Sequence, residues 1–323
     1  MTKIKVGVVR GGPSSEYDVS LKTGGEVLKH LPDNYHGHDV LVAKNSDWHL
    51  NGFLKTPAQI FNSVHGGVEV VFNAMHGEFG EDGKAQQIFE SFNVPYTGSG
   101  VIPSFLAMQK HLARDLFLKS GLKIPRGFVF YKDDFDGLDA EDCAREVFNS
   151  MAPPWVAKSA GAGSSLGVSV CQTFPELIEG IQLAADFGRT VLVEEHIKGK
   201  EATCGILEDF RGENHYALPV VEIMPPENKF SICPAGFDNA TKIMIEEIAK
   251  IAHQALGCRH YSRADFIVSP RGVYLLEVNT LPGLTSESLL PKAAAAAGLE
   301  FPQLLDHLIK LALTPPLAGL TKV

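Results

Sequence analysis

The chain has 323 residues and a formal net charge of −9, from 29 basic and 38 acidic side chains. At roughly 150 residues per domain, this length predicts two or three domains, and the acidic balance argues against binding to the phosphate backbone of nucleic acids. No apolar stretch approaches the ~18 residues that span a membrane, and the first residues lack the apolar core of a signal peptide. We therefore expect a cytoplasmic protein with neither a membrane nor a nucleic-acid partner.

The five cysteines are scattered singly along the chain, and no two of them form a Cys-x-x-Cys pair. An odd, unpaired set fits a reducing compartment better than a disulfide framework or a cysteine zinc site. We expect each cysteine to be a small buried apolar residue.

The first hundred residues alternate strand and helix signals. An apolar run at 4–9 precedes Gly11-Gly12-Pro13 and a helix that opens near Ser15, and a second apolar run at 68–75 precedes a glycine-rich stretch and a helix at 84–92. Such repeated strand–glycine–helix units predict an α/β layer with a parallel sheet. Ligands of open α/β sheets bind beside the loops that leave the carboxyl ends of the strands.

A single helix is predicted from about 103 to 120, and the middle of the chain then becomes strand-rich. The strands expected there are 127–131, 155–158, 167–171 and 190–194, with a helix at 175–187. In the last third we expect strands at 202–207 and 218–223, a hairpin at 262–279, and helices at 241–256, 288–297 and 302–313. These shifts in composition place soft domain boundaries near 98 and 193.

The predicted hairpin carries the most informative polar set. A turn at Ser269-Pro270-Arg271-Gly272, centred on Arg271, places Asp265 opposite Glu277 and Arg263 opposite Asn279. Alternation along the strands gives a core face composed of Ala264, Phe266, Val268, Tyr274, Leu276 and Val278. The other face ends in two carboxylates and an amide oxygen, which suit Mg²⁺ beside nucleotide phosphates. One alternative is that these residues form only a surface ion pair. The other is that the two strands pair one residue out of this register, which would move the polar side chains to different faces.

A strand that ends in Lys158 runs into the glycine- and serine-rich stretch 161–167, and a second strand follows. Neither the Walker A pattern nor the dinucleotide fingerprint fits, because both require a helix at this point. A hairpin loop remains, whose backbone N–H groups could close over phosphates above the lysine. An ordinary loop would be the better interpretation if the carboxylate hairpin were absent.

A third segment is the apolar strand that leads into Glu194-Glu195-His196-Ile197, followed by Glu201. Its polar backbone could hydrogen-bond a flat base edge, and Glu201 could accept ribose hydroxyl protons. An edge strand that meets solvent has the same pattern, so this segment is the weakest of the three.

Together with further blocks, these segments resemble the D-alanine:D-alanine ligases of the ATP-grasp superfamily over essentially the whole chain. The blocks are Gly11-Gly12-Pro13-Ser14-Ser15-Glu16, His76-Gly77, Gly80-Glu81-Asp82-Gly83, Pro95-Tyr96-Thr97-Gly98-Ser99-Gly100, Gly163-Ser164-Ser165-Leu166-Gly167, Cys233-Pro234-Ala235, Ser262-Arg263-Ala264-Asp265 and Leu276-Glu277-Val278-Asn279-Thr280-Leu281-Pro282-Gly283. The resemblance implies an α/β ATP-grasp fold of three domains: a substrate-binding domain at 1–98, a lobe with the phosphate loop at 99–193, and a lobe with the metal and catalytic residues at 194–323.

The resemblance also implies the activity and its cofactors. One D-alanine carboxylate attacks the γ-phosphate of ATP to give an acyl phosphate, and the amine of a second D-alanine then displaces phosphate. The product serves peptidoglycan precursor synthesis. Two Mg²⁺ ions, with Mn²⁺ as a substitute, and a homodimer are implied in the same way. The alternatives are a related carboxylate–amine ligase, a D-alanyl-D-lactate ligase, and a nucleotide-binding protein without ligase activity.

Site residues follow from the resemblance position by position. The expected catalytic set is Glu16, Ser164, Arg263 and Gly283; the expected ATP-binding set is Lys110, Lys158, Ser165, Glu194, Glu195, Ile197 and Glu201; Glu16, His76 and Ser288 would bind substrate; and Asp265, Glu277 and Asn279 would hold the metal ions. Arg263 and the N–H of Gly283 would form the oxyanion site.

The sequence departs from the family pattern at 224–232, where the family usually carries a longer covering loop with tyrosines and a lysine. Here the interval is short and lacks the tyrosines, and only Lys229-Phe230 offers a remnant. Because a charge-assisted contact is worth about 1.5–3 kcal/mol, we expect weaker binding of the second substrate, a relaxed choice of acceptor, or closure by another group.

Overall fold

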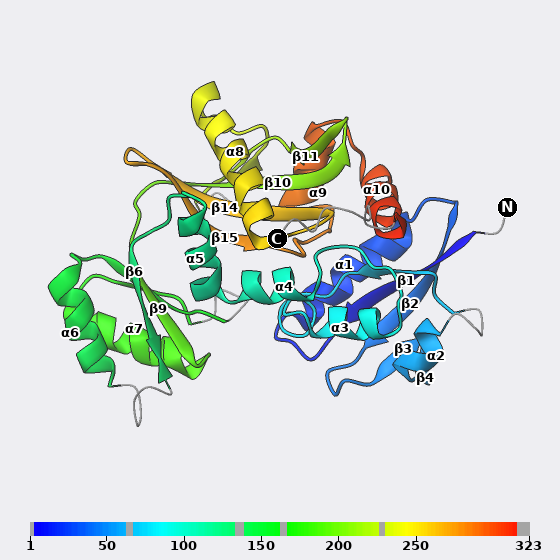
Figure 1. Ribbon diagram of the computed structural model, residues 1–323, viewed down its shortest axis with the longest axis horizontal. Helices are drawn as coiled ribbons and strands as arrows, with labels where there is room; N and C mark the ends of the chain where they lie inside the picture. Colours follow the sequence, from blue (N-terminus) through cyan, green and yellow to red (C-terminus); the bar gives the residue numbers. More distant parts are fainter. Residues whose placement is uncertain (1–2, 63–66, 133–138, 162–166, 226–229, 315–323) are drawn as a thin grey trace.

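Three β-sheets with helices packed against them make up the computed structural model, which describes residues 3–62, 67–132, 139–161, 167–225 and 230–314 (Figure 1). The first sheet has the strand order β4-β3-β2-β1-β5, with β1 parallel to both β2 and β5. Its strands are β1 (Ile4–Gly11), β2 (Tyr35–Val42), β3 (Trp48–Leu50), β4 (Phe53–Lys55) and β5 (Val70–Asn73). The helices in this part of the chain are α1 (Tyr17–His30), α2 (Pro57–Phe61) and α3 (Lys84–Ser91). The parallel pairs confirm the predicted α/β layer.

The second sheet has the order β6-β9-β7-β8, and all its pairs are antiparallel. Its strands are β6 (Gly127–Tyr131), β7 (Trp155–Ser159), β8 (Ser169–Cys171) and β9 (Thr190–Glu195), and its helices are α6 (Ala140–Ser150) and α7 (Phe174–Asp186). The two helices pack on the sheet around the fully buried Trp155.

The third sheet follows the path β13-β12-β10-β14-β15, with β11 paired to β10. Its strands are β10 (Lys200–Phe210), β11 (Glu213–Ala217), β12 (Val221–Ile223), β13 (Ser231–Ile232), β14 (Tyr261–Ser269) and β15 (Gly272–Asn279). Helix α8 (Asn239–Leu256) packs against this sheet, and its apolar face joins the core of the sheet. Because the sheet is antiparallel, β14 and β15 bring residues 265 and 277 side by side.

The helix predicted from 103 to 120 is in fact two helices, α4 (Val101–Met108) and α5 (Lys110–Lys119), which are separated at Gln109 (φ −86°, ψ 85°). The N–H of Lys110 donates to the carbonyl of Ala160 at 2.7 Å, so a tertiary hydrogen bond takes the place of a helical one. The break sets Lys110 at the first position of α5, next to the strand that carries Lys158.

The end of the chain returns to its beginning. Helices α9 (Leu289–Ala296) and α10 (Phe301–Leu313) share one core with β1 and β5, and Figure 1 shows the red α10 beside the blue α1 and β1. Tyr35 donates a hydrogen bond to Asp306 at 2.8 Å across this junction. The first sheet is therefore held against the C-terminal part of the chain.

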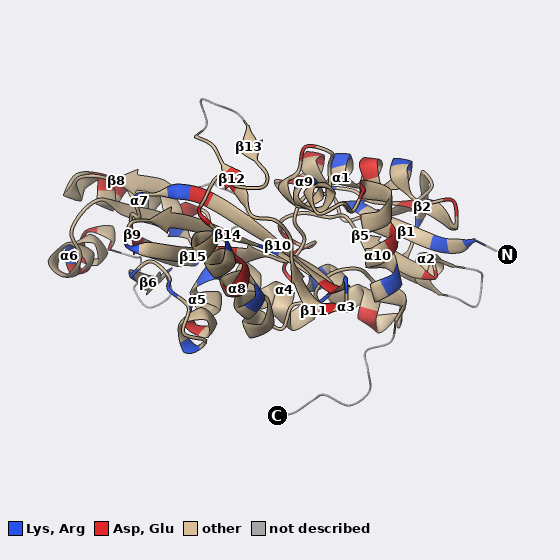
Figure 2. Ribbon diagram, turned by 90° about the horizontal axis from the view of Figure 1, so that it is seen from above, with Lys and Arg blue, Asp and Glu red and all other residues tan. Residues whose placement is uncertain are grey.

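The outer face of α1 alternates acidic and basic residues, at 18, 22, 26 and 29, as Figure 2 shows. Such alternation is typical of a solvated helix face. Among the described residues, no helix combines the length and the apolarity needed to cross a membrane.

Ile309 and Ile243 offer a matched test of the α10 junction, because both are helical isoleucines but Ile309 is 0% exposed and Ile243 is 59% exposed. Ile309→Ala should lower the free energy of unfolding by about 2–5 kcal/mol, since it leaves a cavity in the shared core. Ile243→Ala should change it by no more than about 0.5 kcal/mol. Urea denaturation measures both, and equal losses would contradict the packing described.

Candidate active site

A cavity of ≈ 420 Å³ lies between the second and third sheets. Its walls combine apolar side chains with acidic and basic groups from both sheets. The lining includes Val156, Lys158, Val168, Glu194, Glu195, His196, Ile197, Glu201, Asp265, Ile267, Leu276 and Glu277. Eight residues of the predicted ATP and metal sets, from positions far apart in the sequence, therefore border one cavity: Lys110, Lys158, Glu194, Glu195, Ile197, Glu201, Asp265 and Glu277.

The open end of the β14–β15 hairpin has the predicted register, with Asp265 opposite Glu277 and Arg263 opposite Asn279. Arg263 donates to both carboxylate oxygens of Asp265, from Nε at 2.9 Å and from Nη2 at 2.8 Å. Asn279 donates from Nδ2 to Asp265 Oδ2 at 3.1 Å, and Thr203 donates its hydroxyl to Oδ1 at 2.6 Å. Arg263, Asn279 and Thr203 thus form one connected hydrogen-bond network around Asp265.

The predicted core face of this hairpin is wrong at Tyr274 and Leu276, which lie on the opposite face of β15 from Val273 and Leu275. A register shift between Asp265 and Phe266 pairs Phe266 with Leu275 rather than with Leu276. Val273 and Leu275 are consequently core residues, whereas Leu276 lines the cavity. The bulge gives the cavity an apolar wall directly next to Glu277.

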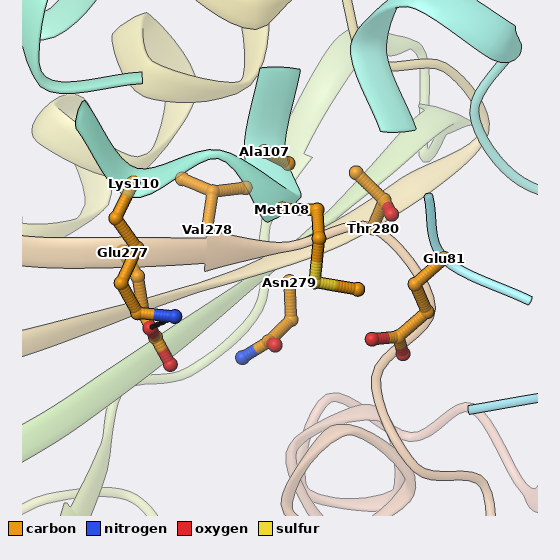
Figure 3. Close-up of a pocket in the computed structure, with 8 residues that line it drawn as sticks. All are labelled: Glu81, Ala107, Met108, Lys110, Glu277, Val278, Asn279 and Thr280. Atoms are coloured by element: carbon orange, nitrogen blue, oxygen red, sulfur yellow. Dashed lines mark ion pairs between the residues drawn. The ribbon is translucent and has the colours of Figure 1, made fainter. Parts of the chain in front are cut away.

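Lys110 and Glu277 form an ion pair at the edge of the cavity, with Nζ 3.1 Å from Oε2. Figure 3 shows this pair, with Asn279 beside it on β15 and Glu81 facing them from the other side of a smaller cavity. Burial raises the pKa of Glu277, but the ammonium groups of Lys110 and Lys158 outweigh it and hold that pKa below its ordinary value. The Glu277 carboxylate is therefore charged and oriented toward a cationic neighbourhood.

Glu194 is the buried centre of a second charge cluster. Its side chain is only 4% exposed, and Lys158 Nζ lies 2.5 Å from its Oε2. Arg114 donates from Nη1 to the other oxygen and from Nη2 to the carbonyl of Pro125 at 2.9 Å. Sequence analysis missed Arg114; its only signal was its place one helical turn after Lys110. Glu194 thus holds Lys158 against the cavity wall.

Glu195 connects the two sheets that form the cavity. Its carboxylate accepts from the N–H of Arg126 at 3.0 Å and pairs with Arg271, in the hairpin turn, at 3.1 Å. Its own N–H donates to the carbonyl of Arg126 at 2.8 Å. Ile197 is buried beside it, and Glu201 is an exposed residue on β10 at the cavity edge. That these residues contact adenine and ribose stays a prediction.

Glu16 and His76 lie together on loops of the first sheet. His76 is buried, with Nε2 2.8 Å from the Thr23 hydroxyl and Nδ1 3.4 Å from Glu81 Oε1. Gly77 has φ +70°, and a Cβ there would lie 2.5 Å from Ser14 Oγ and 3.2 Å from Glu16 Oε1. Glycine therefore allows the two loops to touch, which brings Glu16 next to the His76–Glu81 pair.

The pKa of Glu16 is raised, first by burial and next by the negative charges of Glu81 and Glu277. His76 and Lys110 oppose this shift but do not cancel it. Glu81, from a loop of the first sheet, and Glu277, from the hairpin, line one smaller cavity, so the first sheet and the hairpin face one site.

Gly283 and Ser288 lie beside each other before α9. A Cβ on Gly283 would lie 2.8 Å from the Ser288 hydroxyl oxygen, which accepts from the N–H of Thr285 at 3.1 Å. Ser288 occupies the N-cap position of α9, so its backbone sits where anions are stabilised. The predicted residues Ser164 and Ser165, as well as Lys229, lie outside the described residues.

The donor set at the hairpin end fits the predicted Mg²⁺. Asp265, Glu277 and Asn279 offer only oxygen donors, which are hard ligands of the kind that Mg²⁺ prefers. The amide nitrogen of Asn279 already donates to Asp265, so its amide oxygen is the atom left to face a cation. Lys110 and Lys158 lie beside these residues and add positive charge to this end of the cavity.

This arrangement of two antiparallel sheets around a charged cavity defines an ATP-grasp protein. The D-alanine-D-alanine ligase from Coxiella burnetii has the same fold, with a TM-score of 0.85 over 97% of this chain and 94% of that chain at 24% identity. The VanG D-Ala:D-Ser ligase from Enterococcus faecalis has a TM-score of 0.83 at 29% identity, over 96% of this chain and 99% of that one.

The sequence comparisons then give the family. The family description "D-ala D-ala ligase C-terminus" matches residues 116–310, and "D-ala D-ala ligase N-terminus" matches residues 54–99. A D-alanine--D-alanine ligase from Syntrophobacter fumaroxidans is 35% identical over 96% of this chain and 98% of its own length. The chain belongs to the D-alanine–D-alanine ligase family.

Glu16 generates a pH prediction. Because its folded pKa lies above the ordinary value of 4.5, Glu16 stabilises the fold most fully below pH 4.5, and this contribution is lost as the pH rises through the folded pKa. In Glu16→Gln, the free energy of unfolding should therefore fall less than in the parent protein as the pH is raised from 4.5 toward neutrality. Urea titrations across this range measure the difference. If the free energy of unfolding changes with pH equally in Glu16→Gln and in the parent protein, the raised pKa of Glu16 is refuted.

Carbon NMR of the Glu16 carboxyl gives a second test: the pKa of Glu16 should be lower in Glu81→Gln than in the parent protein, because Glu81 raises it.

Arg114 generates a stability prediction. Arg114→Ala removes one of the two cations that face the buried Glu194 carboxylate, and breaking a buried pair in this way costs about 3–5 kcal/mol. Arg145→Ala is the matched control, since Arg145 pairs with Glu141 at 2.7 Å on the exposed surface of α6, where such a pair is worth about 0.3–0.5 kcal/mol. Chemical denaturation of both variants checks the ratio. A loss at Arg114 no larger than that at Arg145 would show that Glu194 does not need the guanidinium.

Proposed function

We propose that this protein is an ADP-forming ligase that joins two D-alanine molecules into D-alanyl-D-alanine for peptidoglycan precursor synthesis. The observation that carries the proposal is the single charged wall on which Lys110, Lys158, Asp265 and Glu277 meet. The full-length relatives named as D-alanine--D-alanine ligases support the same activity. The wall matches the need of phosphoryl transfer, which depends on positioning and on stabilisation of charge.

In the proposed reaction, a carboxylate oxygen of the first D-alanine bonds to the γ-phosphorus of ATP, and the bond to the β–γ bridging oxygen breaks to release ADP. The amine of the second D-alanine then attacks the acyl carbon, loses a proton and expels inorganic phosphate. Lys110 and Lys158 would contact the phosphates, while Arg263 and the N–H of Gly283 would stabilise the oxyanion. Loss of one oxyanion donor typically costs about 10²–10³ in rate.

Asp265, Glu277 and Asn279 would hold two Mg²⁺ ions, for which Mn²⁺ could substitute. The ions would neutralise charge on the nucleotide phosphates when bound. Arg263 already holds both oxygens of Asp265 in place, so the protein orients this carboxylate by itself. The assignment rests on the oxygen-only donor set and on its position between two lysines.

The remaining predicted residues would bind substrate and nucleotide. Glu16, beside His76, would accept the ammonium group of the first D-alanine, and Ser288 would contact the carboxylate of the second. Glu194, Glu195, Ile197 and Glu201 border the cavity and would surround adenine and ribose, and the serine pair of the phosphate loop would close over the phosphates.

Three further statements belong to the proposal. We divide the chain at 98 and 193, so that each unit contains most of one sheet, although α10 packs back on the first sheet. We assign the protein to the cytoplasm, where ATP and reduced cysteines occur. A homodimer follows from the family resemblance, and light scattering of the purified protein tests it.

The activity is tested by ATP- and Mg²⁺-dependent release of phosphate with D-alanine, with mass spectrometry of the product. We expect D-alanyl-D-alanine and no product from L-alanine. Lys158→Gln should lower kcat/KM by about 10²–10³, whereas Lys310→Gln, an exposed lysine of α10, should leave it unchanged. ATP binding without product from any amino acid would overturn the ligase proposal.

A second candidate, with a different acceptor, is favoured by the short interval at 224–232. The VanG D-Ala:D-Ser ligase is a structural relative over nearly the whole chain. Competition assays with D-alanine, D-serine and D-lactate as acceptors at fixed donor concentration distinguish the candidates. A product mixture dominated by D-alanyl-D-serine or D-alanyl-D-lactate would replace the first proposal by the second.

A further inference from the structure

Two histidines and a glutamate converge on the side of the third sheet that faces α8. Each residue offers one possible metal-ligand atom, and these atoms all lie within 4.8 Å of one another; the three residues are Glu208, His215 and His253. His253 Nε2 is 3.4 Å from Glu208 Oε1, and His215 Nε2 is 3.9 Å from the same oxygen. None of the three lines the active-site cavity, so the proposed ligase chemistry leaves the cluster without a role.

The fold itself enforces this convergence. Glu208 and His215 are direct cross-strand partners in the β10–β11 hairpin, and His253 projects onto them from α8. The histidine from α8 is fully buried, while the side chains of Glu208 and His215 are 22% and 27% exposed. A ligand could therefore enter from the hairpin side and still reach the buried imidazole.

A second layer of hydrogen bonds orients each of the three groups. His253 Nδ1 lies 2.7 Å from the Ser262 hydroxyl, which leaves Nε2 as the atom directed at Glu208. Glu208 Oε2 accepts from the backbone N–H of His260 at 2.5 Å, which leaves Oε1 toward the histidines. His215 Nδ1 lies 3.2 Å from Nε2, the nitrogen of the Gln254 side-chain amide. If the amide is rotated by 180°, its oxygen accepts a hydrogen bond from Nδ1–H of His215. The other ring nitrogen, Nε2, is then unprotonated and can bind a cation.

We propose that Glu208, His215 and His253 form a binding site for a borderline divalent transition-metal cation of the Zn²⁺ type. Two imidazoles and one carboxylate are a known ligand set for zinc. Bonds of about 2.0–2.2 Å in a tetrahedral arrangement put neighbouring ligand atoms roughly 3.4 Å apart, close to the observed 3.4 and 3.9 Å. The outer hydrogen bonds from Ser262 and the His260 backbone match the supporting layer that metal-bound histidines and carboxylates have.

The site would differ in chemistry from the oxygen-only set at Asp265. Mg²⁺ prefers oxygen ligands, whereas imidazole nitrogen favours zinc and its neighbours in the first transition series. The cation would tie α8 to the β10–β11 hairpin, since it draws ligands from both. Its effect would therefore appear as added stability of the third sheet, and it would not take part in the reaction.

The test is a titration of the full-length, chelator-treated protein with Zn²⁺ and, separately, with Co²⁺, in an excess of Mg²⁺ that saturates oxygen-only sites. We expect one equivalent of Zn²⁺ to bind by equilibrium dialysis and to raise the Tm. Co²⁺ should give the visible absorption bands of a tetrahedral nitrogen–oxygen site. The rise in Tm is measured from the protein already saturated with Mg²⁺, so that any stabilisation by Mg²⁺ at the oxygen-only set is complete before Zn²⁺ is added.

Variants decide where the cation binds. His215→Gln should weaken Zn²⁺ binding by at least about 100-fold. Gln254 is exposed and its amide lies 3.2 Å from His215 Nδ1, so Gln254→Ala should weaken Zn²⁺ binding by roughly 10-fold. His36→Gln is the matched control, because His36 and His38 form another close histidine pair, on β2 of the first sheet. The proposal is overturned if the parent protein binds no Zn²⁺ under excess Mg²⁺, or if His36→Gln abolishes binding while His215→Gln retains it.

Discussion

The active site depends on one constraint: a carboxylate taken out of water must be met by positive charge and hydrogen bonds. Glu194 is nearly inaccessible, and two cations from different elements converge on it. Isolated in a low-dielectric surrounding, this carboxylate would cost several kcal/mol. Because Arg114 comes from α5 and Lys158 from β7, the pairing fixes helix, strand and cavity wall relative to one another. The position of Lys158 is thus a consequence of how Glu194 is buried.

The β14–β15 hairpin shows how far sequence reasoning reached and where it stopped. The predicted pairs of Asp265 with Glu277 and of Arg263 with Asn279 are confirmed. The turn, however, is not centred on Arg271 as predicted, so the turn alone does not produce these pairs. Ser269 pairs with Gly272, so the loop has two residues, and the extra residue of the bulge restores the register at the open end. A turn motif reveals the hairpin, whereas a bulge depends on packing against the cavity, which local sequence does not encode.

The difference between local sequence signals and contacts across the fold also explains which other elements were predicted correctly and which were not. Strands and helices with strong periodicity, such as β6, β9 and α10, were predicted within a residue or two of their bounds. The sequence analysis did not predict β2, whose exposed positions are His36 and Gly37. It joined α4 to α5 because the break at Gln109 is stabilised by a contact with Ala160. Arg114 escaped notice because its partner lies 80 residues away. Motif spacing indicates which residues are chemically suited to a site, but partners drawn from separate elements become visible only in the fold.

Negative charge is concentrated around Glu16 at one end of the site. Burial raises the pKa of Glu16, and the negative charges of Glu81, from the first sheet, and of Glu277, from the third, raise that pKa further. Lys110 and His76 oppose this effect without cancelling it. In the reaction proposed above, the incoming ammonium group would find its counter-charge already in place among these carboxylates. The packing of α10 on the first sheet holds the acidic groups in this relation before any ligand arrives, so the fold itself maintains the repulsion that ligand binding would relieve.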